Sequence, residues 1–63
     1  MRKLNVGERV AFYLKDTLTR DFGEIIEVGE KTVVIQSLRE IEVDIRNIIS
    51  VRGEDGNYYA LSE

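Results

Sequence analysis

Short segments in which apolar and polar residues alternate recur along the chain, and this two-residue period is typical of β-strands with one buried face. The clearest is Ile41–Ile45, in which three β-branched residues share one face while Glu42 and Asp44 occupy the other. Polar or glycine-containing stretches separate it from similar segments. The pattern predicts an all-β chain of five strands and a possible sixth, near 10–14, 23–28, 32–36, 41–45, 49–51 and 57–61.

The stretch 21–36 is predicted to form the central hairpin, because two apolar strands flank a glycine-containing turn. Gly29 in that turn is expected to adopt the positive φ that a tight hairpin favours. A bulge near Glu27 is expected to bring Ile25 and Val28 both to the core. Three consecutive β-branched residues after the turn favour a strand over a helix.

Three local features suggest how these strands are arranged. The polar segment 15–21 predicts a long loop after the first strand, and Gly23 is expected to let a neighbouring strand approach closely. Asp44 can cap a single helical turn at 45–48, because its carboxylate can accept hydrogen bonds from the free amides there. The chain is therefore predicted to form one domain, 1–63: a small SH3-like barrel of five strands with a one-turn 3-10 helix and a possible sixth terminal strand.

Composition supports a small globular domain and narrows its chemistry. The chain has 63 residues, of which 43% are hydrophobic and 33% charged, as in folded domains of this size. No apolar run approaches the roughly 20 residues needed to span a bilayer, so the expected location is the cytoplasm. The net charge of −3 argues against a protein whose main task is to neutralise phosphates. Residues 1–22 nevertheless carry five basic groups against three acidic ones, whereas residues 23–63 carry four against nine.

The chain contains neither cysteine nor histidine. It therefore lacks thiolate metal ligands, a cysteine nucleophile and the usual general base at neutral pH. The serine and threonine hydroxyls have no histidine to activate them, and the acidic residues are not spaced as in a calcium loop. We expect no enzyme activity, no metal site and no cofactor.

Three stretches together resemble a known family: Val6–Val10, Phe22–Val28 and Ile41–Val51. Their glycine and apolar spacing is similar to that of the KOW-type SH3-like barrel at the carboxy-terminal end of the bacterial transcription elongation factor NusG, one of many Tudor-like and SH3-like barrels. The resemblance implies a non-catalytic module that binds partners of the transcription or translation machinery, or nucleic acid, through loops and strand edges. The chain is also similar to the small stand-alone SH3-like proteins of bacteria and their phages.

Exposed aromatic residues are the first candidates for partner binding, because rings provide large contact area at low entropic cost. The predicted partner-binding residues are Tyr13, Phe22, Tyr58 and Tyr59. Phe22 is the leading candidate, since Gly23 and Ile25 take the inward positions of its strand. The alternative interpretation is that these rings cover the open ends of the barrel.

Basic residues in the first third of the chain suggest nucleic-acid binding as an alternative, with contacts from Arg9, Lys15 and Arg20. Glu42 and Asp44, with Glu24 and Glu27 adjacent, would instead present an acidic surface to a basic protein. A third interpretation is pairing of a free strand edge, at 58–61 or 32–36, with an extended peptide or a second copy to give a homodimer.

Overall fold

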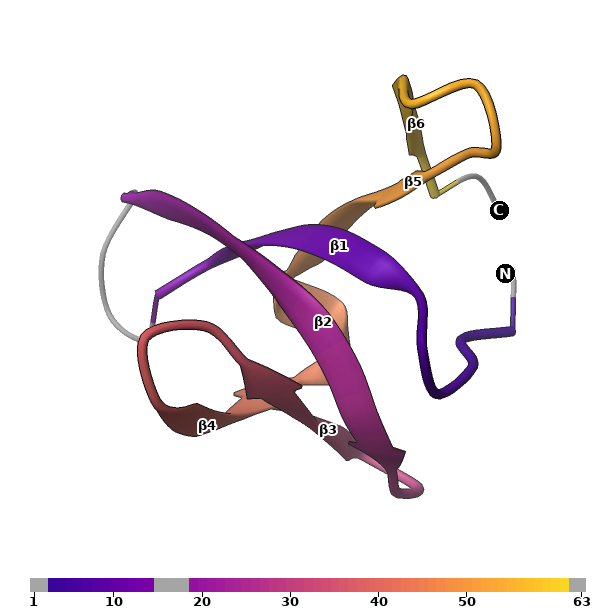
Figure 1. Ribbon diagram of the computed structural model, residues 1–63. Helices are drawn as coiled ribbons and strands as arrows, with labels where there is room; N and C mark the ends of the chain where they lie inside the picture. The colour runs from indigo at the N-terminus through magenta and orange to yellow at the C-terminus, as the bar shows by residue number, and fades with distance from the viewer. Residues whose placement is uncertain (1–2, 15–18, 62–63) are drawn as a thin grey trace.

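The computed structural model describes residues 3–14 and 19–61 (Figure 1). Apart from one short helical turn, its regular elements are all strands, which confirms the predicted all-β class, including the sixth strand. In chain order the elements are β1 (Arg9–Tyr13), β2 (Arg20–Val28), β3 (Thr32–Gln36), β4 (Glu40–Asp44), the 3-10 helix η1 (Ile45–Asn47), β5 (Ile48–Arg52) and β6 (Tyr58–Ala60).

The six strands form one antiparallel sheet in the order β4-β3-β2-β1-β5-β6. Figure 1 shows the long β2 crossing in front of β1 and running on to β3. The sheet is not closed, so the predicted five-stranded barrel is not confirmed. Its edges are β4 and β6. The prediction that 32–36 offers a free edge is wrong, because β3 is hydrogen-bonded to β2 on one side and β4 on the other.

The core lies on one face of this curved sheet and uses the inward residues of the predicted alternation. Val33 and Ile35 of β3 are fully buried, as predicted. Leu4, which precedes the first strand, is also buried. The core residues are Leu4, Val10, Phe12, Ile25, Val33, Ile35, Val43, Ile48 and Val51.

The predicted irregularity in β2 is present. Ile25 pairs with Ile35, but Glu27 pairs with Val34, so one extra residue lies between them. This bulge turns Val28 to the core face, as expected, because Val28 then pairs with the buried Val33. Val28 is the last residue of β2, however, and 40% of it remains exposed. The expectation that it joins the core is therefore wrong.

Two glycine predictions have different outcomes. A Cβ at Gly23 would lie 2.8 Å from the carbonyl oxygen of Gln36 and would collide with the Ile35 side chain, which confirms the close approach of β2 and β3. Gly29 does not have a positive φ; among the described glycines, that conformation occurs at Gly7 (96°) and Gly56 (89°). The Gly29 amide instead closes the hairpin by donating to the Thr32 carbonyl at 2.8 Å.

The turn between β4 and β5 is capped as predicted. Asp44 has an extended backbone, and its Oδ1 accepts a hydrogen bond from the Arg46 amide at 2.8 Å. The Arg46 guanidinium also donates to Asp44, at 3.2 Å from Nε to Oδ1 and 3.0 Å from Nη2 to Oδ2. This cap redirects the chain from the edge strand β4 into β5, next to β1.

Candidate functional site

The outer face of β2, β1 and β5 has a floor of small residues. Ala11 lies opposite Phe22 of β2 on one side and Ser50 of β5 on the other. Since successive residues of a strand point to opposite faces, Ala11 faces away from its core neighbours Val10 and Phe12. Ala11 and Ser50 are nevertheless buried, so larger side chains must cover this part of the outer face.

An aromatic pair lies at this position. The ring centroids of Phe22 and Tyr58 are 5.3 Å apart with an interplanar angle of 68°, an edge-to-face arrangement that aromatic rings favour. We infer that the two rings meet above the small floor and bury Ala11 and Ser50. Phe22 still exposes 49% of its surface and Tyr58 38%. The pair is therefore held in a defined geometry and remains accessible to a partner.

Three arginines share the outer face with this pair. Arg9 lies opposite Glu24, Arg20 opposite Tyr13, and Arg52 opposite Tyr58. The Arg9 to Glu24 ion pair is long, at 4.0 Å. In the described part of the chain, no carboxylate lies within ion-pair distance of Arg20 or Arg52. We call the surface formed by Phe22, Tyr58, Arg9, Arg20 and Arg52 the aromatic–arginine face.

The structure thus brings together residues from both predicted sets, the aromatic and the basic, but not all of them. Tyr13 belongs to the same face by register, yet it also lines a separate groove with Ile41 and Val43 beside β4. Tyr59 is 54% exposed and pairs with the core residue Val51, so it points to the other side of β6. Lys15 lies outside the described residues.

Arg52 is a member of this face that the sequence patterns did not single out. It is the last residue of β5 and its side chain is exposed. Its relevance depends on the pairing of Arg52 with Tyr58, which is set by the Gly53–Gly56 turn. Alternation alone assigns Arg52 to the polar side of a strand but does not indicate which neighbours it meets.

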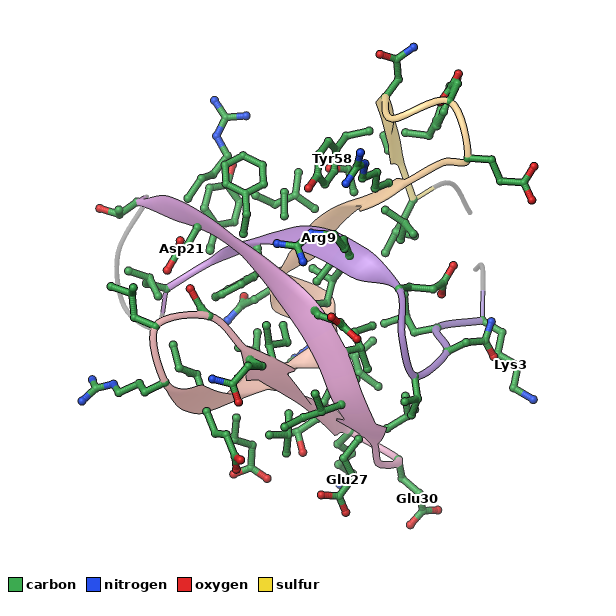
Figure 2. The ribbon with its side chains drawn as sticks, in the orientation of Figure 1. Lys3, Arg9, Asp21, Glu27, Glu30 and Tyr58 are labelled. Carbon is green, nitrogen blue, oxygen red and sulfur yellow. The ribbon has the colours of Figure 1, made fainter. Side chains whose placement is uncertain are left out.

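A second surface, of opposite charge, covers the outer side of β3 and β4. Glu27 and Glu42 are the two cross-strand neighbours of Val34 and line one shallow depression with it. The Thr32 hydroxyl donates to Glu42 Oε2 at 3.0 Å and fixes that carboxylate. We call Glu27, Glu40, Glu42 and Asp44 the acidic face. The predicted neighbour Glu24 lies at the boundary of this face, between Arg9 and Gln36. Figure 2 shows Glu27 and Asp21 toward opposite ends of β2.

Two carboxylates have lowered pKa values. The Arg46 side chain donates to Asp44, and this hydrogen bond, followed by that of the Arg46 amide, lowers the Asp44 pKa. The Tyr59 hydroxyl and then the Asn57 amide lower the pKa of Asp55 in the same way. Asp44 is half-buried and Asp55 is exposed, and both stay charged at neutral pH. Because the lowered pKa values arise from turn and cap hydrogen bonds, they indicate structural roles rather than proton transfer.

Over residues 3–14 and 19–61, no three acidic side chains are grouped closely enough to hold a metal ion. None of the helical structure described is long and apolar enough to cross a membrane. The surfaces that the structure does present are suited to binding by rings, by guanidinium groups and by carboxylates. Comparison of the chain with protein-family models, with curated proteins and with solved structures finds no match.

Proposed function

We propose that this protein is a non-catalytic binding module that engages a protein partner through the aromatic–arginine face. The observation that carries the proposal is the edge-to-face Phe22–Tyr58 pair, which stays partly exposed on the outer face that also contains the buried Ala11 and Ser50. Tyrosine and arginine are enriched among the residues that dominate protein interfaces, and rings already ordered by packing lose little entropy on binding.

The exposed part of the Phe22 ring offers apolar area to a partner. An aromatic side chain buries about 150–250 Å² when fully covered, and about half of that area is still exposed on Phe22. At about 25 cal/mol per Å², covering it would contribute roughly 2–3 kcal/mol before the costs of association. Among the described residues no carboxylate pairs with the guanidinium groups of Arg20 and Arg52, which favours a partner with acidic side chains around an apolar centre.

We further propose that the fold is SH3-like, of the KOW or Tudor type. The supporting features are the sheet order in which β1 joins β2 to β5, the bulged β2, and the single 3-10 turn before β5. The resemblance to the NusG carboxy-terminal domain would then suggest a partner in transcription or translation.

The test is affinity capture from lysate followed by cross-linking with the purified partner. Tyr58→Ala combined with Arg52→Gln should abolish capture, whereas Leu38→Ala should not alter it. Leu38 is a matched control because it is a fully exposed apolar residue of the β3–β4 turn that is not a member of this face. Thermal unfolding of each variant separates loss of binding from loss of fold. Unchanged capture by the folded double variant would refute the proposal.

Binding of single-stranded nucleic acid is a second candidate, favoured by the three arginines beside two rings. Proteins that bind single strands combine aromatic rings, on which the bases stack, with basic side chains, which neutralise the phosphates. Homopolymeric RNA or DNA oligonucleotides should then bind with an affinity that falls steeply with salt, and Arg20→Gln should reduce the salt slope by about one. Absence of binding at low ionic strength would reject this candidate and leave the protein partner unaffected.

A further inference from the structure

Within residues 3–14 and 19–61, every second backbone amide of the edge strand β4 has no hydrogen-bond partner. Ile45 donates its amide to the Lys31 carbonyl at 2.9 Å, and Ser37 donates its amide to the Arg39 carbonyl at 3.1 Å, at opposite ends of the β3–β4 ladder. Antiparallel pairs alternate between hydrogen-bonded and non-hydrogen-bonded. Between these two bonds, the amides of Glu40, Glu42 and Asp44 therefore point away from β3, toward the open edge of the sheet.

The side chains of the same three residues are acidic, so this edge favours basic side chains on an added strand. They lie on the outer face, because Val43 between them is buried in the core. Arg46 already pairs with Asp44, so the available negative charge is concentrated at Glu40 and Glu42. A strand added beside β4 would place its own side chains about 4.5–5.5 Å from these carboxylates, which favours lysine or arginine there.

A groove of about 450 Å³ with a mixed lining runs along this edge. Tyr13, Leu14, Ile41 and Val43 supply its apolar part, and polar side chains, Glu42 and Asp44 among them, supply the rest. A strand paired with β4 would direct alternate side chains into this groove. Those side chains should be apolar, since they would contact Ile41, Val43 and the tyrosine ring.

We propose that β4 binds an extended segment of a partner protein as an added antiparallel strand, in which basic residues opposite Glu40 and Glu42 alternate with apolar residues facing the groove. This site is separate from the aromatic–arginine face and does not rest on the function proposed for it. Pairing of β4 with β4 of a second copy would set like carboxylates beside one another, which is destabilising. The other edge strand, β6, has no basic residue to offer: its sequence is Tyr58-Tyr59-Ala60.

The probe is a capped peptide of about nine residues that alternates lysine and valine, long enough to cover a strand of this length. Amide hydrogen exchange is measured by NMR on the full chain with and without saturating peptide. Exchange at Glu40, Glu42 and Asp44 should slow by about ten-fold or more, because their amides gain partners on binding. The same peptide N-methylated at its lysines keeps every charge but cannot donate to β4, and it should bind at least about ten-fold more weakly.

Charge-removing variants test which carboxylate contributes to peptide affinity. Glu42→Gln should raise the peptide Kd by about two- to five-fold, as expected for an exposed ion pair. Glu54→Gln, in the exposed β5–β6 turn, is the matched control and should leave the Kd unchanged. Equal binding of the N-methylated peptide would overturn the proposal, since charge alone would then explain the affinity. Slowed exchange of the β4 amides that depends on protein concentration without peptide would also overturn it, by showing that a second copy occupies this edge.

Discussion

Replacing Gly23 by alanine tests how closely β2 and β3 approach each other. A Cβ at this position would lie 2.8 Å from the Gln36 carbonyl oxygen and closer still to Cγ2 of Ile35. The first neighbour is backbone and the second is a fully buried side chain, so neither can move aside without disturbing the ladder. Overpacking of this kind costs about 1–3 kcal/mol.

The sign of the stability change distinguishes the close packing at Gly23 from the usual effect of replacing glycine by alanine. Gly→Ala normally stabilises a compatible site by about 0.4–1 kcal/mol, because alanine restricts the unfolded chain. A domain of 63 residues has a total stability of about 3–9 kcal/mol at the usual value per residue. The substitution should therefore remove a substantial part of the free energy of unfolding and lower the Tm by roughly 5–20 °C.

The measurement is urea and thermal unfolding followed by circular dichroism. Glu24→Ala is the matched control, because it places alanine at the next position of β2, where the side chain is exposed and its ion pair with Arg9 is long. Its effect should stay within about 0.5 kcal/mol. If Gly23→Ala unfolds at or above the wild-type midpoint, the close packing of β2 against β3 is refuted.

Two further predictions concern the cap and the aromatic pair. Because the folded-state pKa of Asp44 is lowered, its contribution to stability is complete above the ordinary carboxyl pKa and is lost as pH falls through the lowered value. Asp44→Asn should therefore lose less stability than wild type over that acid range, and identical urea midpoints against pH for the two proteins would contradict the Arg46 interaction. A double-mutant cycle of Phe22→Ala and Tyr58→Ala should give a favourable coupling of about 0.5–1.5 kcal/mol in unfolding free energy; additive effects would show that the rings do not stabilise each other.

Local patterns predicted the elements of this fold because each depends on a few neighbouring residues. The alternation at Ile41–Ile45, the bulge before Val28 and the Asp44 cap all follow from steric and hydrogen-bonding preferences within a short segment. The positive φ expected at Gly29 does not occur, because several turn geometries can close a hairpin. Val28 reaches the inner face but lies at the end of its strand. How much of a residue at a strand end is exposed depends on whether distant parts of the chain cover it.

The candidate site was only partly predictable for a related reason. The sequence places Phe22 and Tyr58 in the aromatic set and Arg9 in the basic set, each as an exposed residue of suitable chemistry. They share one surface because β1 lies between β2 and β5, and because the Gly53–Gly56 turn returns β6 along β5. Such contacts join residues far apart in the sequence, and a single sequence contains no signal for their register.

The two proposed surfaces can act independently despite the small size of the domain. The sign of the outer-face charge changes across β2, where Glu24 separates Arg9 of β1 from Gln36 and Glu40 of β3 and β4. Arg9 and Glu40 are three strand spacings apart, about 14 Å along the sheet, whereas charges at physiological ionic strength are screened over about 8 Å. A partner at either surface therefore responds to the local charge and not to the net charge of −3. An acidic partner centred on the Phe22–Tyr58 pair and a basic strand on β4 would each meet the opposite local charge, so the chain would be able to link two partners of opposite charge.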